Sequence, residues 1–311
     1  MTRQNVLWRA VALCFALAIF ALAAGRSAPA LAQGVTIECP PAETPATGAA
    51  ATPAAESTPS EAAVATAVPF PEDGGSLTVF AAASLTDAFE EIANELTARY
   101  PDLSLTFNFA GSQALVTQLE QGAVADVFAS ANLRQMEVAQ SKGLIEGEPI
   151  IFVQNALVVV VPADNPAGIA SPADLARSGI KLVLAQAGVP VGEYARQSLC
   201  LMGADPATYG EDFVSKVAAN VVSEEDNVRA VLTKVQLGEA DAGIVYASDV
   251  TPDVASEVQT ITIPDAVNVV ASYPIASVAG GNRALADAFI SYVLSPEGQA
   301  ILQRYGFEPK P

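Results

Sequence analysis

The chain has 311 residues, enough for two α/β lobes, and it contains no histidine. Asp and Glu number 34 against 15 Lys and Arg, and a formal charge of −19 excludes binding to nucleic acid or anionic lipid through bulk charge. Without histidine, the usual Ser-His-Asp and Cys-His catalytic arrangements and all His-based metal sites are excluded.

Residues 1–32 have the pattern of a secretory signal peptide. Arg3 and Arg9 precede an apolar run at 10–24, and Ala30-Leu31-Ala32 is a small-x-small cleavage site. The run is shorter than the ~20 residues that span a bilayer, so we expect cleavage, with a retained anchor as the alternative. The protein is expected in the periplasm or on the outer face of the membrane.

Residues 33–75 are predicted to form a disordered tether. The segment is rich in Pro, Ala, Thr and Glu and offers almost no bulky apolar side chain to bury, so it cannot offset the entropy cost of ordering. Cys39 lies near its start and would pair with Cys200 in an oxidising compartment, or stay free. The folded body is expected to begin at Ser76.

Strand and helix patterns alternate after Ser76. Period-2 or continuous apolar patterns predict strands at 77–81, 103–109, 124–130, 156–162, 181–185, 243–247 and 258–263. Helical spacing predicts helices at 85–99, 112–121, 131–142, 226–237 and 282–305, the last interrupted at Ser295-Pro296. The continuous apolar runs at 156–162 and 181–185 are typical of buried parallel strands.

Repeated strand–helix units predict an α/β fold of two lobes, each a mostly parallel sheet flanked by helices. Lobe 1 would comprise 76–152 with 272–311, and lobe 2 would comprise 153–271. A ligand would lie in the cleft between the lobes. Closure would be a hinge motion of the crossing strands near 152–154 and 271–273.

Two of the strand-to-helix junctions combine a serine with residues of minimal bulk. Ser84 follows three alanines at 81–83, and Ser112 follows Gly111. A helix N-terminus carries unpaired N–H groups and partial positive charge, so an oxyanion can approach the backbone there and accept a bond from the hydroxyl. The alternative is that each serine only caps its helix.

Two further stretches present bare backbone or acidic residues at a helix start. Gly188, Pro190 and Gly192 are predicted in a loop before a helix, in the segment GVPVGEYARQSL. The acidic cluster of EEDNVRAVLTKV (224–235) is expected to interact with the helix dipole rather than with a metal. Asp226 is the predicted cap of that helix.

Tyr246 ends a predicted strand in GIVYASD and could direct its hydroxyl into a cleft. The alternative for an isolated tyrosine is a place in the core or at its rim.

An ordered set of segments resembles the periplasmic molybdate-binding proteins of ABC transporters. These segments are FAAASLTDAF, FAGSQALVTQLEQGAVADVFASA, VPVGEYA, DNVRAVL, GEADAGIVYASD and RYGF, and the resemblance covers about 77–308. It implies a type II periplasmic-binding-protein fold whose oxyanion is held only by neutral donors. Hydroxyl and N–H groups would come from Ser84 and Ser112, N–H groups from Val191 and Val228, and a hydroxyl from Tyr246.

The resemblance also implies a non-enzyme that captures molybdate or tungstate and delivers it to an ABC permease with its ATPase. It implies a monomer with no cofactor, no nucleic acid and no metal except within the oxyanion. Val191 stands where the family often has alanine, and Gly111 where serine can occur. The tether is not part of the family pattern.

Other functions stay open from the sequence. The same scaffold could bind another tetrahedral oxyanion such as sulfate, or serve as a tethered sensor of occupancy. A hydrolase would use Ser84 or Ser112 as nucleophile, and without histidine its base would have to be a lysine such as Lys181 or Lys234.

Overall fold

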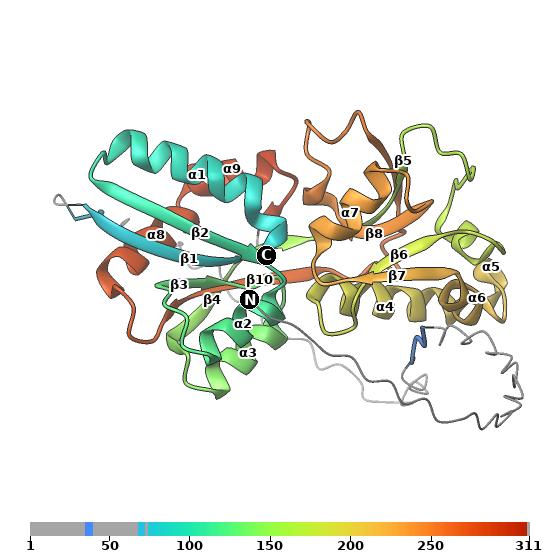
Figure 1. The fold of residues 1–311 in the computed structure, drawn as a ribbon, viewed down its shortest axis with the longest axis horizontal. Coiled ribbons are helices and arrows are strands. Elements are labelled where there is room, and N and C mark those ends of the chain that lie inside the picture. The colour runs from blue at the N-terminus through green and yellow to red at the C-terminus, as the bar shows by residue number, and fades with distance from the viewer. Residues whose placement is uncertain (1–34, 40–67, 72–73, 310–311) are drawn as a thin grey trace, which may run out of the picture. The chain divides into compact units, whose positions relative to one another are not determined.

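The computed structural model describes residues 35–39, 68–71 and 74–309 (Figure 1). The predicted signal peptide and most of the predicted tether lie outside these ranges. Among the described helices, none has the length and apolar character needed to cross a membrane. The described residues belong to one compact unit, Gly34–Pro311.

The first lobe is a six-stranded sheet with helices on both faces (Figure 1). Its strands are β1 (Gly75–Ala82), β2 (Leu103–Ala110), β3 (Val127–Ala129), β4 (Ile145–Asn155), β10 (Ala271–Val278) and β11 (Glu308–Pro309). Its helices are the 3₁₀ helix η1 (Ala83–Leu85), α1 (Thr86–Arg99), α2 (Ser112–Glu120), α3 (Leu133–Ser141), α8 (Arg283–Leu294) and α9 (Pro296–Arg304). The strand order is β11-β4-β10-β3-β1-β2.

The second lobe is a five-stranded sheet in the order β7-β6-β8-β5-β9. Its strands are β5 (Leu157–Pro162), β6 (Leu182–Ala185), β7 (Val221–Glu225), β8 (Ala242–Tyr246) and β9 (Val258–Thr262). Its helices are η2 (Pro172–Ala176), α4 (Pro190–Gly203), α5 (Pro206–Tyr209), α6 (Phe213–Asn220), α7 (Val228–Gln236) and η3 (Ala247–Asp249). Figure 1 shows α7 on one face of this sheet and α4 and α6 on the other.

Alternation along β1 explains how lobe 1 buries both faces of its sheet. Leu77, Val79 and Ala81 pack in the core beneath α1 and α8, whereas Phe80 faces the other way, into the cluster formed by α2 and α3. The side-chain period of two in a strand produces this division. The β1 register with β2 then places the ends of both strands at one edge of the sheet.

Helix boundaries follow local signals in the sequence. Helix α1 ends at Arg99 because Pro101 disfavours a helical conformation at Tyr100, which has φ −127°. The predicted break at Ser295-Pro296 is confirmed: Ser295 has ψ 160° and its hydroxyl accepts a bond from Gly298 N–H at 3.2 Å.

Strands β4 and β10 connect the two lobes. They pair antiparallel with Asn155 opposite Ala271, and one residue separates β4 from β5 of the second sheet. The predicted lobe boundaries fall within these strands, near the ends that meet lobe 2. The run at 156–162 is not a parallel strand, because β5 pairs antiparallel with β8 and β9. A continuous apolar run reports burial on both faces and carries no information about direction.

The described ends of the predicted tether pack against different lobes. Ile37 is buried, and a disulfide joins Cys39 to Cys200 on α4 of lobe 2. Val68 N–H donates to the Ser291 hydroxyl of α8 at 2.8 Å, and the Phe70 ring lies 5.1 Å from the ring of Tyr100 in lobe 1. The chain therefore contacts lobe 2 before the undescribed segment 40–67 and lobe 1 after it.

Candidate functional site

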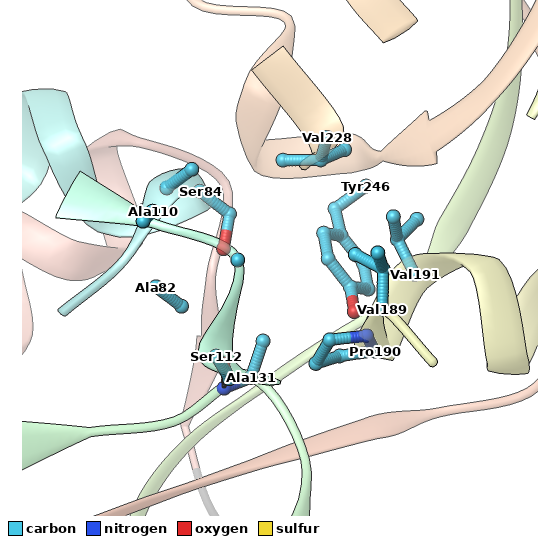
Figure 2. Close-up of a pocket in the computed structure, with 12 residues that line it drawn as sticks. Ala82, Ser84, Ala110, Ser112, Ala131, Val189, Pro190, Val191, Val228 and Tyr246 are labelled. Atoms are coloured by element: carbon cyan, nitrogen blue, oxygen red, sulfur yellow. Dashed lines mark hydrogen bonds between the residues drawn. The ribbon is translucent and has the colours of Figure 1, made fainter. Parts of the chain in front are cut away.

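The five residues predicted to bind the ligand line one small pocket between the lobes (Figure 2). Ser84 and Ser112 lie on the lobe 1 side, and Val191, Val228 and Tyr246 lie on the lobe 2 side. The pocket is located where strands of both sheets end, which is the usual place for a ligand in open α/β sheets. The remaining lining residues are small or apolar and include Ala82, Ala110, Ala131, Val189 and Pro190.

Ser84 does not cap a helix. It lies within η1, while α1 begins two residues later without a side-chain cap. Its hydroxyl oxygen is 2.9 Å from the hydroxyl of Tyr273, and only 3% of the residue is exposed. The capping alternative is therefore wrong for this serine, whose hydroxyl faces the pocket in Figure 2.

Ser112 does not cap a helix either. It is the first residue of α2, and the residue in the cap position, Gly111, has no side chain to bond the free N–H groups. The Ser112 hydroxyl accepts a bond from Ala131 N–H at 3.0 Å. Since that contact occupies only a lone pair, the hydroxyl hydrogen remains available as a donor.

The first turn of α4 carries Val191. The helix begins at Pro190 and has no side-chain cap, so the Val191 N–H lies among the amides that lack an intrahelical acceptor. Pro190 and Gly192, expected in a loop, are helical. A Cβ at Gly192 would overlap the carbonyl oxygens of Ala185 and Gln186 at the end of β6, so glycine is what allows the helix to start so close to the sheet.

The helix α7 begins at Val228, and its cap is not Asp226. Asn227 occupies the cap position and its side-chain oxygen accepts from Ala230 N–H at 3.0 Å. The first turn of this helix contains no acidic residue, so the predicted interaction of Glu224 and Glu225 with its dipole is wrong. Glu224 and Glu225 belong to β7 rather than to the helix. Glu224 forms an ion pair with Arg196, and Glu225 forms one with Lys234 at 2.8 Å.

Tyr246 is 1% exposed, and its hydroxyl has no hydrogen-bond partner among the described protein groups. The ring closes the pocket on the lobe 2 side (Figure 2). Burial raises the pKa of Tyr246 well above its ordinary value, so the hydroxyl keeps its hydrogen at any physiological pH. A buried polar group without a partner costs free energy, so this hydroxyl calls for an explanation.

The pocket is electrically neutral at its surface. None of its lining residues carries a charged side chain, and the cavity volume is ≈ 10 Å³. The polar groups that this lining offers are hydroxyls and backbone groups, which are uncharged. An acceptor-only anion can accept from the donors among them.

Contacts between the lobes surround the pocket. Arg229 of α7 pairs with Asp87 of α1, and Arg134 Nε lies 3.0 Å from Glu193 of α4. The Gln113 amide nitrogen also donates to the carbonyl oxygen of Asp226 at 2.9 Å. These three contacts join lobe 1 to lobe 2.

A buried carboxyl group is hydrogen-bonded to the backbone of Tyr246. Asp249 is fully buried, accepts a bond from Tyr246 N–H at 3.0 Å, and lies 3.4 Å from Arg229 Nε. Burial raises its pKa from 3.8 to about 7, in spite of the lowering by Arg229, and Asp87 adds to the rise.

We expect the contribution of Asp249 to the free energy of unfolding to decrease as pH rises. Because its pKa is higher in the folded state than in the unfolded state, the folded protein binds more protons between about pH 4 and pH 7. The contribution is complete below that window and is lost as pH rises through 7. Urea unfolding at pH 5 and pH 8 should show a smaller decrease for Asp249→Asn than for the unchanged protein. Equal decreases would contradict the raised pKa.

Several residues of the site carried no signal in the sequence. Tyr273 contacts Ser84 directly, and Asn155 is linked to Ser84 through Tyr273. Both lie in strands, and the sequence pattern of these strands predicts only burial. Ala131, whose N–H fixes the Ser112 hydroxyl, follows β3 in a stretch that had been predicted as the start of a helix. Their roles depend on tertiary contacts between segments far apart in the chain.

Comparisons with known proteins identify the family of the chain. Residues 77–308 match the family of bacterial extracellular solute-binding proteins. The molybdate-binding protein ModA of Mycobacterium tuberculosis is 42% identical over 233 residues, which are 75% of this chain and 84% of that protein. The molybdate-binding protein ModA of Escherichia coli is 34% identical over 248 residues, 76% of this chain and 91% of that protein.

A solved structure shares the fold. The periplasmic molybdate-binding protein of Azotobacter vinelandii has a TM-score of 0.65, with 18% identity, over 76% of this chain and 100% of that chain. This similarity confirms the predicted two-lobed α/β fold. The prediction that each sheet is mostly parallel is wrong, because three of the five strand pairings in lobe 1 and two of the four in lobe 2 are antiparallel.

Proposed function

Because the chain belongs to the bacterial extracellular solute-binding proteins, we propose that it captures molybdate outside the cytoplasm and delivers it to an ABC transporter permease. Tungstate, a tetrahedral oxyanion of the same charge, is a second ligand of the same site. The protein acts as a monomer, and the permease is energised by its ATPase. No cofactor is needed beyond the captured anion.

The hydroxyl of Tyr246 is the observation that carries this proposal. It is buried, keeps its hydrogen and has no partner in the part of the chain that the structure describes, and it borders a pocket whose lining carries no charged side chain. In the closed arrangement it would donate to the anion together with Ser84, Ser112 and the N–H groups at the starts of α4 and α7. A protein that used this pocket as ordinary core would leave a hydrogen bond unmade there.

Neutral donors are sufficient to bind a dianion in this acidic protein. A hydrogen bond to a charged group contributes roughly 1.5–3 kcal/mol, and sub-micromolar binding requires about −8 kcal/mol or better. Donors alone also disfavour an oxyanion that carries a hydrogen, because that hydrogen would face another donor. Sulfate shares the charge of molybdate, so its rejection must come from the size of the pocket.

We expect no turnover at this site. Neither Lys181 nor Lys234 lines the pocket, and the Lys234 ammonium is bound to Glu225 and Ser223. The serine hydroxyls contact Tyr273 and Ala131 N–H, neither of which is a base that activates a nucleophile.

Isothermal titration of the ligand-free protein with molybdate, tungstate, sulfate and phosphate tests the function. We expect one molybdate per chain, bound with sub-micromolar affinity, and much weaker sulfate and phosphate. Tight sulfate with weak molybdate would support the sulfate alternative. Absence of binding by all four anions would reject the proposal.

Replacing Tyr246 by phenylalanine should weaken molybdate binding about tenfold or more, because one donor to a charged group is lost. The ligand-free protein should keep its stability, since the hydroxyl has no protein partner to lose. Calorimetry gives the first quantity and thermal unfolding the second. The matched control is Tyr292→Phe, which removes a hydroxyl bonded to Glu95 at 2.8 Å and should affect only stability. Unchanged affinity in Tyr246→Phe would remove Tyr246 from the site.

A further inference from the structure

Behind Ser84, hydrogen bonds link the pocket to both crossing strands. The Ser84 hydroxyl contacts the hydroxyl of Tyr273, and the side-chain nitrogen of Asn155 lies 3.4 Å from that same hydroxyl. The same nitrogen donates to the Ser248 hydroxyl at 2.7 Å. Ser84, Tyr273, Asn155 and Ser248 are each at most 3% exposed.

The donor and the acceptor are fixed for the bond between Asn155 and Tyr273. The nitrogen of Asn155 can only donate, so the Tyr273 oxygen accepts from it. Either hydroxyl can be the donor in the 2.9 Å bond between Tyr273 and Ser84, and one of the two arrangements directs the single hydrogen of Tyr273 to the Ser84 oxygen. Once Ser84 accepts that bond, its own hydrogen is free to point into the pocket that it lines.

We propose that Tyr273 and Asn155 are positioning residues that hold the Ser84 hydroxyl as a donor and so select oxyanions that carry no hydrogen. This inference rests on the proposed oxyanion site and adds two residues that do not line the pocket. Without Tyr273, the Ser84 hydroxyl can rotate and turn its lone pairs to the ligand. It would then repel an acceptor-only anion and accept a bond from a hydrogen-bearing one.

Two residues of the network lie on β4 and β10, the strands that connect the lobes. Asn155 is the last residue of β4, and Tyr273 is the third residue of β10, opposite Val153 of β4. Ser248 lies two residues after Tyr246, in η3 of lobe 2. The network thus joins the donor of lobe 1 to the segment that carries the donor of lobe 2. Chains of buried hydrogen bonds also strengthen one another.

Three variants test the direction of the bonds. Tyr273→Phe should weaken molybdate binding about tenfold and lower the ratio of molybdate to hydrogen phosphate affinity. Asn155→Asp places an acceptor beside Tyr273, which reverses the bonds and should weaken molybdate binding about 100-fold or more. Asn155→Leu removes the donor but leaves Tyr273 free to donate, so its loss should be the smallest of the three.

Titration of each variant with molybdate and phosphate decides between positioning and a merely structural role. Tyr292→Phe is the control for loss of a buried tyrosine hydroxyl in the same lobe. A changed anion preference in Tyr273→Phe, together with the expected order of losses, supports the proposal. Equal weakening for both anions, or wild-type affinity in Asn155→Asp, would overturn it.

A measurement without ligand separates this inference from the proposed function. Unfolding free energies of Ser84→Ala, Tyr273→Phe and the double variant form a thermodynamic cycle. We expect clear non-additivity for this pair and additivity for Ser84→Ala with Tyr292→Phe. If the unchanged protein bound no oxyanion, the proposed function would fail while the cycle still reported the bond. Additive effects of Ser84 and Tyr273 would refute the network itself.

Discussion

Replacing Gly192 by alanine is expected to abolish tight oxyanion binding and to destabilise lobe 2. The added methyl group would overlap the backbone carbonyls of Ala185 and Gln186, neither of which can move without displacing the end of β6. Helix α4 must then shift outward and carry the Val191 N–H away from the pocket. We expect at least about 100-fold weaker molybdate binding and about 1–3 kcal/mol lower stability.

Gly188→Ala is the matched control for this variant. Gly188 precedes the same helix, but a Cβ there meets no atom within 4 Å. Titration calorimetry and urea unfolding should give nearly unchanged values for Gly188→Ala. If Gly192→Ala bound molybdate as tightly as Gly188→Ala does, the start of α4 would not be part of the site.

Ser112→Ala should reduce both affinity and stability. The hydroxyl is proposed to donate to the anion, and the loss of a bond to a charged group corresponds to about 10- to 100-fold in affinity. The same change leaves the buried N–H of Ala131 without its acceptor, which costs about 1–3 kcal/mol of stability. Calorimetry and thermal unfolding measure the two effects separately.

Ser198→Ala separates the binding effect from the general cost of losing a buried hydroxyl. Ser198 is 0% exposed and donates to the Val267 carbonyl at 2.6 Å, but it does not line the pocket. It should lose stability and keep its affinity. Normal molybdate binding by Ser112→Ala would show that the centre of the proposed site is wrongly assigned.

Much of the fold could be predicted from the sequence because its signals are local. Helix α1 buries Ala88, Phe89, Ile92 and Leu96 on one face, and this spacing is visible in the chain. Strand direction is different. The apolar run that becomes β5 predicts burial. Its antiparallel pairing with β8 depends on the path that the chain takes between these two strands. That information is not contained in the run itself.

The residues of the site also divide into those that could be predicted from the sequence and those that could not. The small residues at 81–83 and at Gly111 indicated two places where a ligand could approach a helix, and the resemblance supplied Val191, Val228 and Tyr246. The sequence also left open that the serines only cap their helices, which the structure excludes because their hydroxyls contact Tyr273 and Ala131 N–H. The network through Tyr273 and Asn155 could not be predicted, since it joins residues 189 and 118 positions apart.

The disulfide between Cys39 and Cys200 changes how the whole chain would respond to mechanical force. The two cysteines are 161 positions apart, and the bond closes the intervening chain into a covalent ring that contains β1 to β6 and both junction serines. A pull on the two ends of the polypeptide would pass from Cys39 directly to Cys200 and leave the ring unloaded. Under tension, the half of the pocket that carries Ser84 and Ser112 is therefore shielded as long as the bond is oxidised.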